Sequence, residues 1–150
     1  MDAIGHASIY KFISGEKILI HSLSKLKMGA SIASEPYTWL DKNTSSNKIV
    51  QELLYALEKT KNDLPNPENW ASFSKEFITA IGLKKQSDLY KQSINVAVIK
   101  KDGVITFIPT ANKGNKGFEN IVPPEKIEIE ANRSVEEIAV ALEKAFEKCE

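Results

Sequence analysis

Two apolar runs near the middle of the chain are joined by a short polar turn. Residues 94–99 and 104–108 flank the sequence Lys100-Lys101-Asp102-Gly103. A two-residue hairpin loop needs positive φ angles, which Asp tolerates and Gly adopts freely. The pattern predicts an antiparallel hairpin whose second strand ends at Pro109. Because apolar residues occupy both faces of each strand, we expect this hairpin at the buried centre of a sheet.

Two regions on either side of this hairpin also have strand character. Residues 9–13 and 17–23 are apolar runs around Ser14-Gly15-Glu16, which predicts a second tight hairpin. Residues 126–130 alternate between Ile and charged side chains, as in a half-exposed strand near a sheet edge. The mixed composition of residues 25–40 favours an irregular strand or a loop.

Three segments have helical spacing. A helix capped by Ser45 or Ser46 is predicted to run to about residue 61, because apolar positions recur there every three or four residues. A second helix is predicted to start at Pro67 with Asn66 as its cap and to end at Gly82. Its apolar stripe implies docking on the sheet and consists of Trp70, Phe73, Phe77 and Ile81.

The third helix starts at Ser134. Glu137, three residues further on, has the spacing of a capping box, in which the two side chains satisfy free backbone N–H groups at the helix start. Its buried stripe is predicted to contain Ile138, Leu142, Ala145 and Phe146.

The order of these elements predicts the fold class. We expect residues 1–150 to form a single α+β domain with a mostly antiparallel sheet, a central hairpin and about three packed helices. The alternative is a mixed sheet in which the last strand runs parallel to a neighbour.

The composition excludes some classes of function but does not identify one. The chain has a formal net charge of zero, 42% apolar residues and one cysteine, Cys149. A chain of this kind has no overall field that would drive it onto nucleic acid or an anionic membrane. The lone cysteine and the absence of signal-peptide or membrane-helix patterns lead us to expect a cytoplasmic protein.

The sequence offers no recognisable catalytic or metal site. His6 and His21 are the only histidines, and neither has a second ligand at zinc-site spacing. The Gly-containing loop at residues 113–117 lacks the Ser or Thr and the following helix that a P-loop needs. We therefore predict no cofactor, no metal and no enzymatic activity.

Charge is distributed unevenly along the chain. Between Leu83 and Gly117 the balance is +5, with seven lysines at positions Lys84, Lys85, Lys91, Lys100, Lys101, Lys113 and Lys116. From Glu125 to Glu150 the balance is −4. Such runs usually form solvated faces, but an acidic face can also speed association with a basic protein.

The order of short sequence motifs along this chain resembles that in the immunity proteins of bacterial contact-dependent growth inhibition systems. The resemblance covers about two-thirds of the chain and rests on spacing and residue types rather than on a catalytic motif. In the C-terminal half, the motifs that carry it are Lys91-Gln92-Ser93 before a strand, Ile108-Pro109 at a strand end, the pair Gly117-Phe118, and Ser134 at the start of a helix that contains Ala141-Leu142. In the N-terminal half, they are the region from Gly29 to Pro36 and the pair Ala56-Leu57 in a helix.

The resemblance implies a small cytoplasmic protein that binds and blocks the C-terminal toxin domain of a cognate effector, often a nuclease. No contact residue carries over from the family, so candidate contacts come from charge clustering alone. The partner-binding residues we predict are Glu125, Glu128, Glu130, Glu136 and Glu137, followed by Asp63 and Glu68.

Two other functions stay open at this stage. The chain could be a small enzyme whose site forms only in three dimensions, with His6 or His21 beside a carboxylate and a serine. It could also be a nucleic-acid-associated module that uses the lysines between Lys84 and Lys116, in which case binding would weaken steeply with salt.

Overall fold

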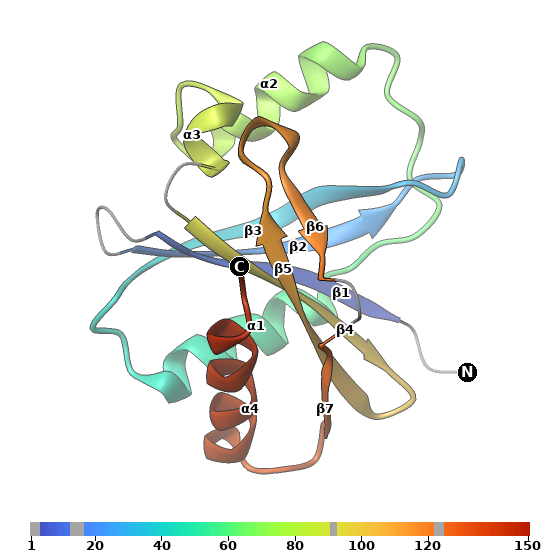
Figure 1. The fold of residues 1–150 in the computed structure, drawn as a ribbon. Coiled ribbons are helices and arrows are strands. Elements are labelled where there is room, and N and C mark those ends of the chain that lie inside the picture. Colours follow the sequence, from blue (N-terminus) through green and yellow to red (C-terminus); the bar gives the residue numbers. More distant parts are fainter. Residues whose placement is uncertain (1–3, 13–16, 91–92, 122–124) are drawn as a thin grey trace.

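A computed structural model of the chain describes residues 4–12, 17–90, 93–121 and 125–150. These ranges form one α+β domain, drawn in Figure 1. Its strands are β1 (Gly5–Phe12), β2 (Lys17–Lys25), β3 (Ser31–Asp41), β4 (Ser93–Lys101), β5 (Val104–Asn112), β6 (Phe118–Asn120) and β7 (Ile127–Glu130). Its helices are α1 (Ser46–Glu58), α2 (Trp70–Ala80), α3 (Gln86–Tyr90) and α4 (Val135–Glu147), with a short 3-10 turn η1 (Gly114–Lys116).

The strands form one sheet in the order β3-β2-β1-β4-β5-β6, and β7 also pairs with β5. Every pairing between named strands is antiparallel. The predicted class is therefore confirmed, and the alternative with a parallel last strand is wrong. The predicted hairpin is also confirmed, because β4 and β5 join through Asp102 (φ 53°) and Gly103 (φ 77°).

Pro109 does not end β5, contrary to the prediction. Val96 opposite Pro109 is the last pair that β5 forms with β4. Beyond it the strand continues to Asn112 by pairing its other edge with β6, where Thr110 lies opposite Asn120. A proline that cannot donate a backbone hydrogen bond is tolerated where a ladder ends, so it marks the change of partner rather than the end of the strand.

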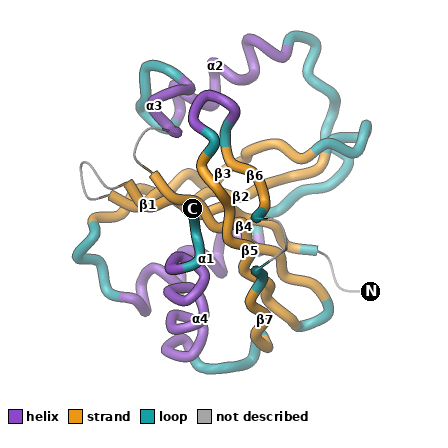
Figure 2. The backbone as a smooth tube through the Cα atoms, in the orientation of Figure 1, coloured by secondary structure: helices purple, strands orange, loops and turns teal. Residues whose placement is uncertain are grey.

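Helices α1 and α4 cover one face of the sheet, as Figures 1 and 2 show. The main core lies between them and the strands, and each fully buried large side chain there contributes roughly 1.5–3 kcal/mol. Its largest members include Ile9, Ile20, Val98, Ile105, Phe107, Leu53, Ile138 and Phe146.

The ends of α1 and α4 agree with their sequence signals. The Ser45 hydroxyl caps α1 by accepting from the Lys48 N–H at 3.2 Å, and α1 ends at Glu58, slightly before the predicted end. The Ser134 hydroxyl caps α4 by accepting from the Glu137 N–H at 3.1 Å. The Glu137 carboxylate in turn accepts from the Ser134 hydroxyl at 3.3 Å.

The second face of the sheet is covered by α2 and α3 at one end. A second core there consists of Tyr10, Leu19, Ile78, Ile81 and Leu89. Towards the opposite end of this face, Leu23, Ala33, Ala97, Ile99 and Ile108 are only partly buried. The sheet is thus covered completely on one face and in part on the other.

The predicted start of the second helix is wrong, and its predicted stripe is buried only at its end, where Ile81 lies in the second core and Phe77 packs against it. Helix α2 begins at Trp70, where the Asn69 side chain accepts from the Ser72 N–H at 3.1 Å. Asn66 is used elsewhere, because its side-chain oxygen accepts from the Met28 N–H at 3.2 Å. Trp70 remains 45% exposed, so the first turn of α2 does not dock on the sheet as predicted.

The segment predicted as an irregular strand or loop contains the edge strand β3. Its register against β2 shifts between His21 and Ser22, where β3 passes from Tyr37 to Ser34 through Pro36. At the opposite edge, β7 pairs only with β5 and keeps the predicted alternation of half-buried isoleucines and exposed glutamates.

Candidate functional site

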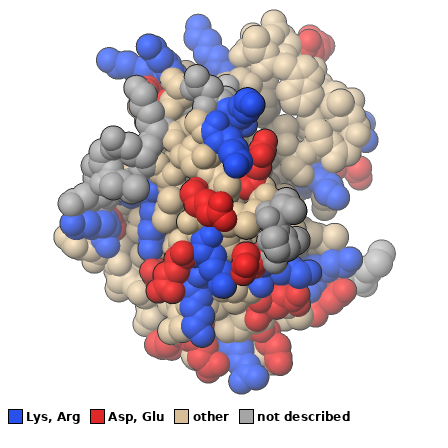
Figure 3. All heavy atoms as spheres, viewed as in Figure 1, with Lys and Arg blue, Asp and Glu red and all other residues tan. Residues whose placement is uncertain are grey.

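Most of the predicted carboxylates gather around the connection between β7 and α4. Glu128 and Glu130 lie on β7, and Glu136 and Glu137 lie in the first turn of α4. All four side chains are exposed. Figure 3 shows acidic side chains, with basic ones between them, over the part of the molecule where Figure 1 places α4 and β7.

The ion pairs of these carboxylates are long and exposed. Arg133 lies 3.7 Å from Glu130 and 3.9 Å from Glu137, and Lys126 lies 3.6 Å from Glu128. Exposed pairs of this kind stabilise a fold by ~0–1 kcal/mol. The carboxylates can therefore exchange these contacts for a partner's cations at little cost to the fold.

The remaining predicted residues lie apart from that group. Glu125 pairs with Lys148 at 3.1 Å, near the end of α4. Asp63 and Glu68 are exposed in the segment between α1 and α2. That segment is tied to the β2–β3 connection by the Lys27 N–H, which donates to the Leu64 carbonyl at 2.9 Å. It belongs to the sheet edge opposite β7, so Asp63 and Glu68 form a second acidic group, separate from the first and from Glu125.

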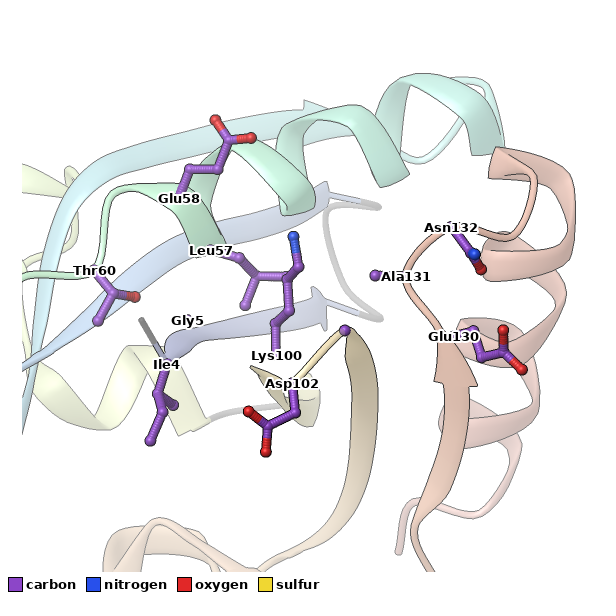
Figure 4. Close-up of a pocket in the computed structure, with 11 residues that line it drawn as sticks. Ile4, Gly5, Leu57, Glu58, Thr60, Lys100, Asp102, Glu130, Ala131 and Asn132 are labelled. Atoms are coloured by element: carbon purple, nitrogen blue, oxygen red, sulfur yellow. The ribbon is translucent and has the colours of Figure 1, made fainter. Parts of the chain in front are cut away.

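A cavity of about 650 Å³ opens beside the first group, and we call it the end recess. It lies where β1 starts, where β4 turns into β5, where β7 ends and where α1 ends (Figure 4). Its lining residues are Ile4, Gly5, Leu57, Glu58, Thr60, Lys100, Asp102, Gly103, Glu130, Ala131 and Asn132.

Two close approaches hold the walls of the end recess in place. A Cβ atom on Gly5 would lie 2.7 Å from the Leu57 carbonyl oxygen, so β1 and the end of α1 fit together only with glycine there. On the other side, the Ala131 N–H donates to the Gly103 carbonyl at 2.8 Å. The end of β7 is thereby fixed to the β4–β5 turn.

Among the described residues that line the end recess, Lys100 is the one cation, beside three carboxylates. Its side chain is partly buried and, in Figure 4, extends between the end of α1 and residues 131–132. No ion pair or hydrogen bond joins its ammonium group to any residue that the structure describes. The recess is therefore a preformed space with mixed charge and a net negative lining.

The lysines between Lys84 and Lys116 do not form one basic region. Lys84 and Lys85 lie between α2 and α3, and α3 contacts η1, which is flanked by Lys113 and includes Lys116. Lys100 and Lys101 lie at the opposite end of β5, a strand of nine residues. With the usual rise per residue of a β-strand, nine residues span about 30 Å, so the two groups of lysines lie that far apart. Lys91 lies outside the described residues.

His21 is a structural side chain in the second core. It is 2% exposed, and burial lowers its pKa to about 4. Its Nδ1 lies 2.8 Å from the Ser22 carbonyl and must donate, so Nε2 accepts from the Tyr10 hydroxyl at 3.2 Å. Burial also raises the pKa of Tyr10 to about 12. Both side chains are thus held neutral, away from any cavity found among the described residues.

His6 and Cys149 likewise lack the surroundings of reactive groups. Burial, followed by the charge of Lys25, lowers the pKa of His6. Burial raises the pKa of the Cys149 thiol, which donates to the Asn95 carbonyl at 3.3 Å. Among the described residues, no three His, Cys, Asp or Glu side chains are placed as metal ligands would be.

None of the helices in the described ranges combines the length and apolar character that crossing a bilayer requires.

The end recess was not predicted from the sequence. Its walls come from four segments that are far apart along the chain, and no local pattern marks Glu58 or Lys100 as neighbours of Glu130. The Asp102-Gly103 turn and the alternating strand were both predicted, but their contact depends on the pairing of β5 with β7.

The chain was compared with protein families, known structures and curated sequences. Residues 6–149 match the family model described as CDI immunity protein. A protein of unknown function from Neisseria meningitidis has a similar structure, with a TM-score of 0.78 and 16% identity over 100% of this chain and 98% of that one. A chain in the CdiA-CT/CdiI toxin and immunity complex from Yersinia pseudotuberculosis has a TM-score of 0.76 and 13% identity, with 99% of both chains covered. No curated protein sequence matches the chain.

Proposed function

This chain belongs to the CDI immunity protein family, and we propose that it binds and neutralises the toxin domain of a cognate contact-dependent growth inhibition effector. The family match over residues 6–149 is the observation that carries the proposal. It is supported by the fold shared with a chain of a toxin and immunity complex over 99% of this chain. The single domain of residues 1–150 acts in the cytoplasm as a binding protein, without a catalytic step of its own.

The toxin is a nuclease, and the immunity protein covers its active site. A nuclease must present cations to nucleic-acid phosphates, so an acidic protein surface can occupy the same site. The carboxylates around β7 and α4 have that character. We assign the contact surface first to Glu125, Glu128, Glu130, Glu136 and Glu137, and second to Asp63 and Glu68.

The electrostatic part of this surface favours rapid capture of a basic partner. Opposite potentials steer two proteins together and raise the association rate most strongly at low salt. A stable complex of this type buries ~1,600 Å². Nanomolar affinity corresponds to about −12 kcal/mol. The carboxylates provide speed and specificity, and the apolar contacts between them provide most of the affinity.

The experiment starts from the effector gene adjacent to the gene for this chain. The C-terminal domain of that effector is purified with and without the immunity protein, and its cleavage of RNA and DNA is measured. We expect a stoichiometric complex that no longer cleaves nucleic acid. An effector domain that stays active with a folded excess of this chain would refute the proposed function.

Charge variants identify the surface in the same assay. Replacing Glu128, Glu130, Glu136 and Glu137 by Gln should slow association by at least tenfold at low salt, because steering depends on these charges. The double variant Asp63→Asn with Glu68→Gln, on the opposite sheet edge, should have the smaller effect. If the double variant slowed association more than the fourfold variant, the contact surface would lie on the segment between α1 and α2.

A further inference from the structure

We infer that the end recess receives an arginine or lysine side chain of the toxin, so that this cavity, rather than the exposed acidic strand alone, fixes how the partner docks. The inference rests on the proposed function only in taking the toxin domain as the partner. It concerns the cavity beside β7, which neither the family match nor the sequence pattern identifies.

The recess is large enough to admit a long side chain. Its volume of about 650 Å³ falls in the range of sites that enclose ligand groups. Leu57 is 3% exposed in its wall, and Ile4, which precedes Gly5 on the same side, has 40% of its surface exposed. These apolar walls can contact the methylene groups of a long cationic side chain while its charged end reaches the polar side chains.

The charge of the lining favours a cation. Asp102, Glu130 and Glu58 come from three different elements and outnumber the single lysine. Figure 4 shows Lys100 between Glu58, Asp102 and Glu130, whose carboxylates extend away from its ammonium group and leave the centre of the recess to Lys100. An arginine fork can reach a carboxylate with two parallel hydrogen bonds, which gives geometric specificity as well as attraction.

The end of α1 adds to the negative potential. The last carbonyls of a helix carry a partial negative charge, and α1 has no basic residue in its last turn. Lys59, which follows that turn, is directed to the Tyr55 ring at 5.1 Å. Among the described residues of the lining, Lys100 is thus the one cation that can offset the negative potential of the helix end at Glu58.

Lys100 occupies the space that the partner's cation would take. Because its ammonium group forms no ion pair with the described residues, little holds it there, and its flexible stem can move aside when a cation enters. Lys100 then reduces the affinity for a cationic side chain through like-charge repulsion. Removing the Lys100 charge should therefore tighten binding of a cationic occupant and weaken binding of an anionic one.

Paired variants of the full chain test the inference against the adjacent effector's C-terminal domain. Lys100→Met removes the charge inside the recess, whereas Lys101→Met removes the same charge one residue away, on an exposed side chain outside the lining. Asp102→Asn and Glu130→Gln remove recess carboxylates, and Glu119→Gln removes an exposed carboxylate of β6 outside the recess. Asparagine tolerates the positive φ of Asp102, so that variant keeps the turn.

We expect Lys100→Met to tighten toxin binding at least threefold relative to Lys101→Met. Asp102→Asn and Glu130→Gln should each weaken binding about tenfold relative to Glu119→Gln, the loss expected for one charge-assisted hydrogen bond. A double-mutant cycle with alanine at each toxin arginine and lysine in turn should identify a single coupled cation.

Weaker binding by Lys100→Met would mean an anionic occupant and would overturn the inference. Recess variants that bind like their controls would mean that the partner leaves the recess empty, while the proposed function would stand. If the wild-type chain does not bind the toxin domain at all, the proposed function itself fails. Urea unfolding of each variant verifies that the compared proteins are folded.

Discussion

Lowering the pH below 6.5 should destabilise the fold through His21. A buried imidazole that is neutral in the folded state takes up a proton much more readily when the chain unfolds. The pKa of His21 is about 4 in the fold and 6.5 in the reference state. The unfolded chain therefore binds more protons between these two values, so stability is complete above pH 6.5 and is lost as the pH falls towards 4.

The magnitude follows from the two pKa values. Proton linkage converts them into a loss of about 2–3 kcal/mol in the free energy of unfolding between pH 7.5 and pH 4.5. This is a large fraction of the ~5–15 kcal/mol that stabilises an ordinary domain. Among the described residues, the partners that contact the ring are Tyr10, Tyr37, Phe77 and the Ser22 carbonyl, and none of these is a carboxylate.

Urea unfolding at a series of pH values provides the assay. It should be carried out in a His6→Asn background, because burial also lowers the pKa of His6 and would contribute in the same direction. His21→Leu in that background should reduce the pH-dependent change in the free energy of unfolding by about 2–3 kcal/mol over the same interval. The reasoning is refuted if both proteins lose equal stability, or if NMR shows that His21 titrates near pH 6.5 in the folded protein.

Three substitutions test local features of the fold by urea unfolding at pH 7.5. Gly5→Ala should destabilise by about 1–3 kcal/mol, because its Cβ would lie 2.7 Å from the Leu57 carbonyl; an unchanged midpoint would mean that α1 moves freely there. Ser134→Ala should cost about 1 kcal/mol by removing the cap of α4, and no loss would show that the cap is dispensable. Trp39→Phe should cost about 1–2 kcal/mol, since the Trp39 indole donates to the Ile81 carbonyl at 2.8 Å; a stability equal to wild type would contradict that bond's role.

Local signals in the sequence predicted the elements that depend on nearby residues. The Asp102-Gly103 turn, the Ser134 cap and the alternating strand at residues 127–130 each arise from backbone geometry or side-chain reach over a few positions. Such interactions are present whatever the rest of the chain does. These parts of the fold could therefore be located before the structure was known.

Features that depend on distant partners were missed or misplaced. Asn66 has the residue type of a helix cap, but its side chain binds the Met28 N–H across the α1–α2 segment, and the helix begins after Asn69 instead. Trp70 fits a buried stripe by spacing, yet its side chain remains 45% exposed in the fold. The end recess has the same origin, since Gly5 marks it only through its contact with Leu57.

The arrangement of the proposed contact residues could be predicted in part. The alternation along β7 and the first turn of α4 placed Glu128, Glu130, Glu136 and Glu137 in one exposed region. The separation of Asp63 and Glu68 from them depends on sheet order, which places the β2–β3 hairpin and β7 at opposite edges. Charge clustering along a sequence therefore describes a surface only after the topology is known.

Protection of living cells tests the central claim most directly. Target bacteria that express this chain are mixed with cells that deliver the adjacent effector, and survival is compared with targets that express no immunity protein. We predict full protection, and specific protection, so that an effector with an unrelated C-terminal domain still inhibits growth. Loss of growth in targets that accumulate the folded chain, at the same rate as in targets without it, would contradict the account.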